Sequence, residues 1–290
     1  MSNPSVLMVQ ERGRHATNWQ FRESENFRRA FNKLGVKCEV WGLGQPTFAV
    51  PFEEIVKDYE VVFVIENYDQ QQWLPDFSKV NKLKVFWSID SHCALGQHVF
   101  FSKISKFDIH LNSTQGYLKN FTKHSGKCLW FPNAYPDDLI DHRPQVQKVH
   151  DLGFCGSMIS DRVQWLDAIS RHIPVHRDVF VIGDAMVDAL NRYKIGLNKT
   201  LAVDINYRVF ETLGAKTLLL TNLVPTMDQL LTPDKHMVTY STLLELVEKT
   251  KYYLNHSDKA LEIALSGYNH VRANHTYYER AKQLLQIVGE

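Results

Sequence analysis

Short apolar runs alternate with helix-like segments through the first 130 residues of the chain. Several runs are apolar throughout, which is typical of strands covered on both faces of a parallel sheet. A helix is predicted between the first two, because apolar residues follow the i, i+3, i+4, i+7 spacing from Phe27 to Leu34 and Gly35 is placed to end it. The predicted strands are 5–10, 36–41, 60–65, 84–89, 108–113 and 127–132.

A second alternation of the same kind follows a segment with three prolines and no periodicity, residues 132–150. The pattern predicts strands at 151–157, 177–184, 195–200, 216–222 and 236–240, helices at 162–170 and 206–215, and three C-terminal helices. We therefore expect two Rossmann-like α/β lobes with parallel sheets facing a central cleft. The expected domains are an N-terminal lobe at 1–135, a linker at 136–150 and a C-terminal lobe at 151–290.

Composition and charge narrow the class of protein. Lys and Arg number 33 against 32 Asp and Glu, which argues against a strongly basic nucleic-acid binder. The four cysteines lie more than 25 residues apart along the chain, so no zinc-ligand spacing occurs and free thiols in a reducing compartment are expected. No apolar run approaches the ~18–20 residues that span a bilayer, and the N-terminus does not resemble a signal peptide. We expect a cytoplasmic protein without a bound metal.

The segment 204–222 carries the most informative chemistry. Asn206 is placed to cap a short helix whose first turn contains Arg208. Helix N-termini attract anions, and an arginine there can bind a phosphate in bidentate fashion. Glu211 lies on the same helical face, and a carboxylate near a phosphate site commonly accepts hydrogen bonds from ribose hydroxyls. The spacing alone also fits an i, i+3 salt bridge on a solvated helix.

The same segment resembles a known family. The pattern N-x-R-x-F-E-x-L-x-A…LLLTN, followed by LLTPDKHMVTY and HTYYERAKQLL, is similar to the CgeB-like (spore maturation protein B) glycosyltransferases. LWFPNAYPDDLIDHRP (129–144) and HDLGFCGSMISDRVQWLDAI (150–169) resemble it as well, so the likeness covers about 128–285. The resemblance implies the GT-B fold, with a nucleotide-sugar donor held in the C-terminal lobe and UDP as the first nucleotide to consider.

The resemblance also implies roles for individual residues. Glu211 would hold the donor ribose, Arg208 would contact the pyrophosphate or the sugar, and Asn206 would line the same loop. The backbone turn at Gly156 and Ser157 would approach the diphosphate, with Arg162 and Lys199 as further cationic candidates. Many retaining GT-B enzymes carry two acids with seven residues between them, and this sequence departs from that pattern: six residues lie between Asp204 and Glu211, and Val203 stands at the family position. The stereochemical outcome therefore stays open.

Glycosyl transfer also needs an acceptor hydroxyl and, in many cases, a base. Asp90 and His92 follow the predicted strand 84–89, so they are expected at the carboxyl end of the first sheet. Arg14 and His15 follow the first strand at the matching edge. We take Asp90 and His15 as candidate catalytic bases and Arg14 and His92 as candidate substrate contacts. A turn or helix cap at Asp90 and a solvent-exposed loop histidine at His15 are the simpler alternatives.

The resulting hypothesis is a glycosyltransferase that uses a nucleotide diphosphate sugar, needs no other cofactor, and has an unidentified acceptor. One alternative is a DNA-modifying glycosyltransferase, because residues 11–29 contain five Arg and one His against three acidic residues. Another is a non-catalytic protein that binds nucleotide sugars, motivated by the departure at Val203. An NAD-dependent oxidoreductase fits the predicted sheets but lacks the glycine fingerprint.

Overall fold

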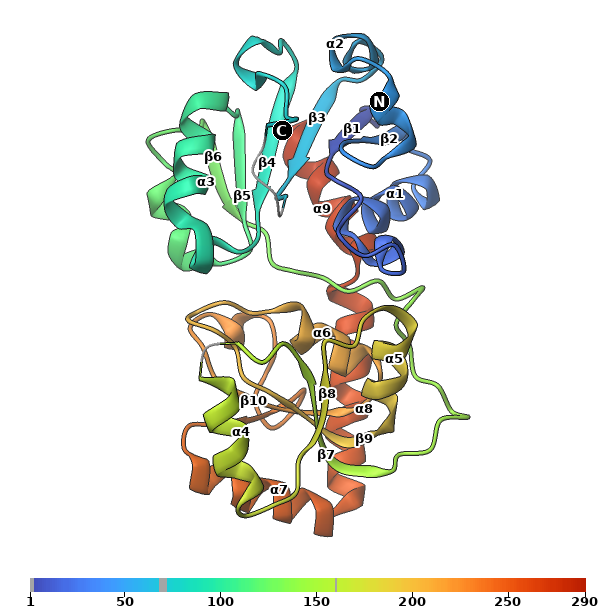
Figure 1. The fold of residues 1–290 in the computed structure, drawn as a ribbon, viewed down its shortest axis with the longest axis vertical. Helices are drawn as coiled ribbons and strands as arrows, with labels where there is room; N and C mark the ends of the chain where they lie inside the picture. The colour runs from blue at the N-terminus through green and yellow to red at the C-terminus, as the bar shows by residue number, and fades with distance from the viewer. Residues whose placement is uncertain (1–2, 68–71, 160) are drawn as a thin grey trace. The chain divides into compact units, whose positions relative to one another are not determined.

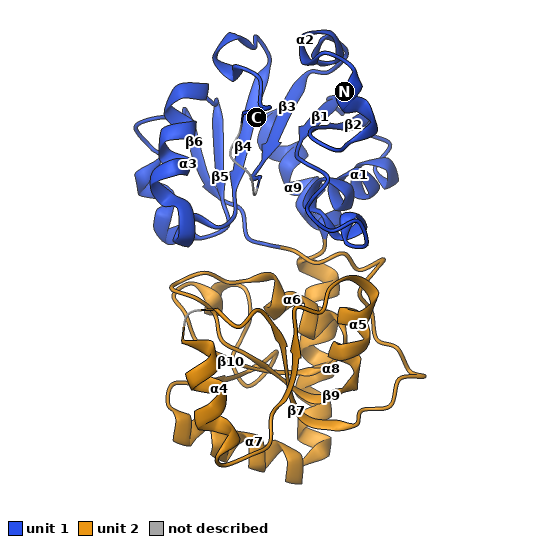
Figure 2. Cartoon of the chain, viewed as in Figure 1, with its two compact units in different colours: residues 1–133, 277–290 blue, residues 134–276 orange. Residues whose placement is uncertain are grey.

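The computed structural model describes residues 3–67, 72–159 and 161–290. The chain folds into two compact units (Figure 2). The first unit comprises Met1–Asn133 with Tyr277–Glu290, and the second comprises Ala134–Thr276. Each unit is built around one parallel sheet. The predicted fold class of two parallel-sheet α/β lobes is therefore confirmed.

The first unit contains a six-stranded parallel sheet in the order β2-β1-β3-β4-β5-β6 (Figure 1). Its central strands are buried along their whole length, as the apolar runs require. All six predicted strands are present, with ends shifted by at most two residues. Their bounds are β1 Val6–Val9, β2 Cys38–Trp41, β3 Val61–Ile65, β4 Leu83–Ser88, β5 Ile109–Asn112 and β6 Lys127–Trp130.

Among its described residues, the first unit contains the α-helices α1 Glu23–Lys33, α2 Phe52–Ile55, α3 Ser91–Ser105 and α9 Tyr277–Gly289. α1 ends as expected, with Gly35 in the left-handed region at φ 68°. Asp90, for which a turn or helix cap was the simpler alternative, occupies the N-cap position of α3, although its side chain does not cap the helix. This helix carries no strong apolar stripe and is kinked at Ala94, which explains why periodicity did not reveal it.

The last helix of the chain, α9, belongs to a different unit from the two helices that precede it, which the sequence did not predict. We expected all three C-terminal helices in the C-terminal lobe, but α9 belongs to the first unit (Figure 2). The Tyr277 ring meets Phe27 of α1 edge to face at 5.2 Å. Nearly buried Arg280 donates hydrogen bonds to the carbonyls of Pro132 (2.8 Å) and Asn133 (3.3 Å). An amphipathic pattern shows that a helix face is buried, but not which partner buries it.

The second unit contains a five-stranded parallel sheet in the order β11-β10-β9-β7-β8. Leu152, Leu197 and Leu220 of its central strands join Leu166 and Leu246 in one apolar core. The strands are β7 His150–Gly156, β8 His176–Val179, β9 Tyr193–Asn198, β10 Leu218–Asn222 and β11 Val238–Tyr240. The helices are α4 Arg162–Ser170, α5 Gly183–Arg192, α6 Tyr207–Gly214, α7 Leu243–Asn255 and α8 Ser257–Asn274.

Short 3-10 helices complete the described part of the chain, at Trp19–Phe21, Pro46–Ala49, Val56–Asp58, Phe77–Lys79, Gln115–Asn120 and Met227–Gln229. Within residues 3–67, 72–159 and 161–290, no helix combines the length and the apolar character needed to cross a membrane. All four cysteines are free thiols, as expected.

Candidate functional site

The second sheet has a topological switch point at β7. This strand pairs with β8 on one side and with β9 on the other. The chain runs from β7 to β8 and then crosses back over β7 to form β9, so the direction of strand addition reverses there. In open parallel sheets, ligands bind in the crevice at the carboxyl ends of the strands that flank such a point. Here those ends are Gly156, the last residue of β7, and Asn198, the last residue of β9. Ser157 and Lys199 follow them directly.

Helix α6 brings Arg208 and Glu211 to this edge. It packs very closely on β9, because a Cβ added at Gly196 would lie 2.5 Å from Thr212 Cγ2. Arg208 Nη1 lies 3.1 Å from Glu211 Oε2, and the two side chains are only 17% and 14% exposed. Burial opposes the charge of Arg208, but the Glu211 carboxylate, together with smaller contributions from Cys155 and Tyr193, raises the pKa of the guanidinium. The predicted i, i+3 pair therefore exists, and it is mostly buried instead of lying on a solvated helix face.

A second guanidinium, that of Arg162, forms hydrogen bonds with the residues that directly follow β7 and β9. Arg162 is only 7% exposed. Its Nη1 lies 3.2 Å from the Ser157 carbonyl and 3.3 Å from Ser157 Oγ, and its Nη2 donates to the Lys199 carbonyl at 2.8 Å. Burial lowers the pKa of Arg162, and the charge of nearby Arg208 lowers it further. Two arginines thus stand close together with one carboxylate, an arrangement that favours an anionic ligand.

Asn206 departs from its expected capping role, and Lys199 is paired with a neighbouring carboxylate. Asn206 occupies the cap position of α6, but its side chain does not cap the helix. Its Nδ2 donates to Asn198 Oδ1 at 3.3 Å, and its buried Oδ1 has no hydrogen-bond partner among the described residues. Lys199 Nζ is ion-paired with the exposed carboxylate of Asp161, so its charge is already partly balanced.

The asparagines at the ends of β9 and β10 were missed by sequence reasoning. Asn198 Nδ2 donates to Thr221 Oγ1 at 3.0 Å. Asn222 binds Thr200 twice at 2.8 Å, accepting from its N–H and donating to its hydroxyl. These bonds fix the loops at the carboxyl edge of the sheet. The sequence signal that could have revealed them is a polar residue at the end of an apolar strand.

The first sheet has its own switch point, between β1 and β3. Gln10, directly after β1, donates to the Glu66 carbonyl at 3.0 Å, and the Glu11 N–H donates to Asn67 Oδ1 at 2.7 Å. The Arg22 side chain is nearly buried. Its Nη2 lies 3.7 Å from Glu11 Oε1, and its Nη1 lies 3.3 Å from Glu23 Oε2. The carboxyl ends of these strands are therefore locked together by polar side chains.

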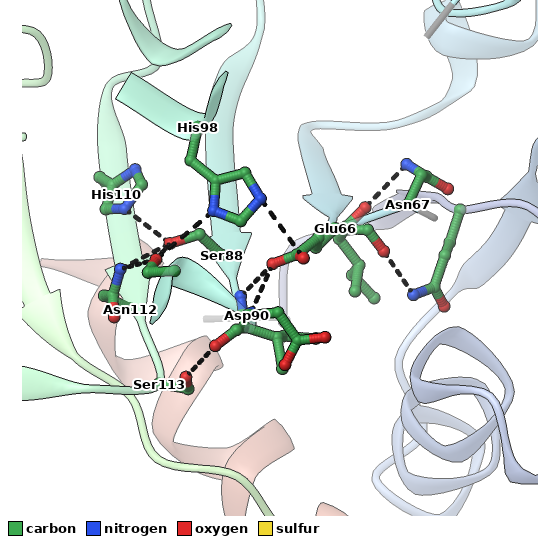
Figure 3. A network of polar contacts seen from close by, with 12 residues as sticks. Glu66, Asn67, Ser88, Asp90, His98, His110, Asn112 and Ser113 are labelled. Atoms are coloured by element: carbon green, nitrogen blue, oxygen red, sulfur yellow. Dashed lines mark hydrogen bonds and ion pairs between the residues drawn. The ribbon is translucent and has the colours of Figure 1, made fainter. Parts of the chain in front are cut away.

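Glu66 and His98 lie side by side, a pairing that the sequence did not reveal (Figure 3). Glu66 Oε2 accepts hydrogen bonds from the backbone N–H groups of Ile89 and Asp90, the latter at 2.8 Å. Its other oxygen lies 3.3 Å from His98 Nε2, and the His98 side chain is 5% exposed. No motif marks these two residues, because they come from different elements, the end of β3 and the middle of α3.

A buried hydrogen-bond network extends inward from His98 (Figure 3). His98 Nδ1 lies 3.4 Å from Ser91 Oγ, which donates to Ser88 Oγ at 3.2 Å. Asn112 Nδ2 donates to both hydroxyls at 2.7 Å, and Ser88 Oγ lies 3.0 Å from His110 Nε2. Burial, with a smaller contribution from His98, lowers the pKa of His110 to about 3, so this ring is neutral near pH 7.

This lowered pKa predicts a pH-dependent stability. An unfolded histidine titrates near pH 6.5, so the unfolded chain binds more protons than the folded one between pH 6.5 and about 3. The free energy of unfolding should therefore fall as the pH is lowered through this window. In His110→Gln the slope against pH should be smaller, by up to about 1.4 kcal/mol per pH unit. Urea unfolding measured across the window tests this, with exposed His172→Gln as the control, and equal slopes in wild type and His110→Gln would contradict it.

The sequence-predicted residues of the first unit are divided between two pockets. Asp90 lines one together with Glu66 and His98. Arg14 and His15 line another, of about 200 Å³, together with Arg22. His92 lies in the first turn of α3, next to Asp90 along the chain.

The arginines of residues 11–29 are largely engaged within the first unit. Arg22 pairs with Glu11 and Glu23. Arg28 Nε donates to Glu25 at 2.8 Å, and Arg29 donates to the Gln20 carbonyl at 3.0 Å. Arg12 stands over the Trp19 ring at 4.8 Å. These contacts leave the segment far less available to a polyanion than its composition indicated.

A family comparison matches just over half of the chain. The model described as "Glycosyl transferase-like" matches residues 139–286, which include α6 and the whole sheet of the second unit. No curated protein matches the sequence.

Solved structures match the whole chain in fold. A glycosyltransferase from Rickettsia africae ESF-5 is 12% identical over 99% of this chain and 98% of its own, with a TM-score of 0.69. Anabaena Alr3699/HepE in complex with UDP and glucose is 10% identical over 99% of both chains, with a TM-score of 0.67. An alpha-glucosyltransferase in complex with UDP and a 13-mer DNA containing a HMU base is 8% identical over the full length of both, with a TM-score of 0.70. These structures share the two-lobe GT-B fold that the sequence analysis anticipated.

Proposed function

Because this chain belongs to the glycosyl transferase-like family, we propose that it transfers a sugar from a nucleoside diphosphate sugar, with UDP as the favoured nucleotide, to an acceptor hydroxyl. One observation carries the proposal: the nearly buried Arg208–Glu211 pair stands beside Arg162 at the switch point of the second sheet. This combination of a cationic surface and one carboxylate suits a diphosphate joined to a ribose.

Each residue of the second unit has a distinct part in the proposal. Arg208 and Arg162 neutralise the diphosphate, which is also the leaving group and needs positive charge as the glycosidic bond breaks. Glu211 accepts hydrogen bonds from the ribose hydroxyls. The backbone at Gly156 and Ser157 approaches the phosphates, and Asn206 and Lys199 line the same edge. In this scheme the reaction requires no cofactor besides the donor sugar nucleotide and the acceptor.

The finer assignment to CgeB-like enzymes rests on the resemblance of residues 128–285. The UDP present with two of the similar folds supports UDP as the nucleotide to test first. On the first unit, Asp90 and His15 stay the proposed bases, with Arg14 and His92 as contacts of the acceptor. The free thiols suit a reducing compartment, so we place the reaction in the cytoplasm.

DNA as the acceptor is a second candidate, because one similar structure contains a DNA with a HMU base. The engagement of Arg22, Arg28 and Arg29 within the first unit argues against a large polyanion-binding surface on residues 11–29. We therefore favour a smaller acceptor.

A thermal-shift screen against UDP-, GDP-, ADP- and dTDP-sugars tests the donor assignment. A ligand that binds the folded state stabilises it in proportion to the logarithm of its concentration over Kd. We expect a UDP-sugar to raise the Tm of the wild type, and Arg208→Ala to weaken its affinity at least about tenfold. Exposed Arg171→Ala is the matched control. Equal affinity of wild type and folded Arg208→Ala would remove the site assignment. The non-catalytic alternative predicts that the protein binds the donor but neither transfers its sugar nor hydrolyses it slowly.

A further inference from the structure

A pocket of about 170 Å³ opens between α3 and the residues that follow β3 and β4 of the first unit. This is many times the space that one water molecule needs, so the pocket can take a ligand of the size of a ring. Its polar wall is formed by Glu66, Asp90 and His98, and its apolar wall by Phe86 and Phe101. The exposed thiol of Cys93 also lines it.

The Glu66 carboxylate is held in place but retains capacity to accept further hydrogen bonds. Among the described residues, three donors reach it: the N–H groups of Ile89 and Asp90, and His98 Nε2. An ionised carboxylate offers about four lone-pair sites, so a hydroxyl of a ligand can add one more bond. His98 is fixed from its other side by Ser91, which makes the pair a preorganised acceptor group (Figure 3).

The apolar wall is equally well defined. Phe86 is 2% exposed and Phe101 6%, and their rings meet edge to face at 5.2 Å. Leu74 lines the same pocket. A sugar ring has C–H faces that pack on such surfaces while its hydroxyls point toward polar groups.

The charges of the pocket exclude one class of ligand. Two carboxylates, Glu66 and Asp90, line it, and no lysine or arginine is among its described lining residues. A phosphate or carboxylate on the ligand would meet these negative groups at short range. A neutral ring with hydroxyls meets no such repulsion.

We propose that this pocket is the acceptor subsite of the enzyme, and that it binds a neutral, hydroxyl-bearing ring of monosaccharide size through Glu66 and the Phe86–Phe101 wall. This assignment rests on the proposed glycosyltransferase function and names the class of its second substrate. It places the acceptor in a pocket built from β3, β4 and α3.

Protection of the Cys93 thiol tests the proposal directly. The protein is treated with iodoacetamide with and without methyl α-D-glucopyranoside, and labelling is followed peptide by peptide in a mass spectrometer, with Cys128 as the internal reference. Labelling of Cys93 should slow as the glucoside concentration rises, reaching about threefold when the free glucoside is at twice its Kd. The corresponding methyl glucuronide, which carries a carboxylate, should protect far less.

Three variants define the site. Glu66→Gln should weaken the protection, because one carboxylate oxygen is replaced by an NH2 group that cannot accept the ligand hydroxyl, and circular dichroism verifies its fold. Gln97→Trp, a change at an exposed position that lines the pocket, should lose protection by filling the pocket while Glu66 itself is kept. Glu53→Gln, on the exposed face of α2, should keep it.

Several results would overturn the assignment. The assignment falls if the glucoside gives no protection, or if the glucuronide protects equally well. It also falls if protection survives both pocket variants, or if only a DNA duplex with hydroxymethyluracil protects. The UDP thermal shift is measured on the same samples. If UDP stabilises the protein and the glucoside fails, the donor proposal stands and the pocket assignment falls. If the glucoside protects but no nucleotide binds, the pocket is a sugar site and its acceptor role falls with the proposed function.

Discussion

Replacing Glu211 with alanine is expected to lower kcat/KM for the donor sugar nucleotide at least about tenfold, or about 1.4 kcal/mol of transition-state stabilisation. Two effects act together. The ribose loses its hydrogen-bond acceptor, and Arg208 loses the carboxylate that lies 3.1 Å away and holds its orientation. A misplaced guanidinium stabilises the leaving diphosphate less well. Steady-state kinetics with the donor found by thermal shift measures the effect.

Two further variants make this result interpretable. Glu211→Gln keeps the shape of the side chain and one hydrogen-bond acceptor, so it should lose less activity than Glu211→Ala. Glu262→Ala, at an exposed position of α8 in the same unit, should leave the kinetics unchanged. A folded Glu211→Ala protein with wild-type donor kinetics would contradict the role of this carboxylate.

Replacing Phe27 with alanine is expected to reduce the free energy of unfolding of the first unit by about 4 kcal/mol. Phe27 is fully buried on α1, and its removal would leave a cavity at the centre of an aromatic cluster. The loss would also loosen the attachment of α9, which joins this cluster through Tyr277. The rings around Phe27 are Phe31 (5.8 Å), Phe63 (5.2 Å), Trp87 (5.8 Å), Phe131 (6.3 Å) and Tyr277 (5.2 Å).

Urea unfolding followed by tryptophan fluorescence measures this loss, since Trp87 lies in the cluster. Phe100→Ala is the control, because Phe100 is 63% exposed and its removal should change stability by less than about 0.5 kcal/mol. A loss below about 1 kcal/mol in Phe27→Ala would show that the cluster can collapse around the missing ring.

The sheets were predictable from the sequence because their strands are covered on both faces. Residues 61–65 are apolar throughout and buried throughout, so composition and burial agree residue by residue. The helices were less predictable. α3 has a mixed sequence and a kink, and α9 has a clear apolar face whose partner, the Phe27 cluster, lies about 250 residues away along the chain. Local patterns carry no information on such distant pairings.

The same distinction applies to the candidate site. Arg208 and Glu211 lie on one short helix, so their pairing could be predicted from an i, i+3 spacing. Glu66 and His98 come from separate elements and meet only after the first sheet has formed. Asn206 shows a third case: its position was predicted, but its side chain binds Asn198 instead of capping α6. Tertiary contacts decide between the bonds that a side chain can form locally.

The two sites differ in charge in a way that suits two different substrates. The edge of the second sheet holds two arginines close to one carboxylate, which favours a diphosphate. The pocket of the first unit is lined by two carboxylates and two phenylalanines, which favours a neutral ring. This difference gives each unit its own ligand class and makes the donor and acceptor assignments independently testable.

A crystal structure of the protein with bound UDP tests the central claim most directly. The account predicts the diphosphate at the carboxyl ends of β7 and β9, within hydrogen-bond distance of the Arg208 guanidinium, and the ribose hydroxyls on Glu211. UDP bound at any other place, or Arg208 and Glu211 still paired only with each other while UDP occupies the protein, would contradict it.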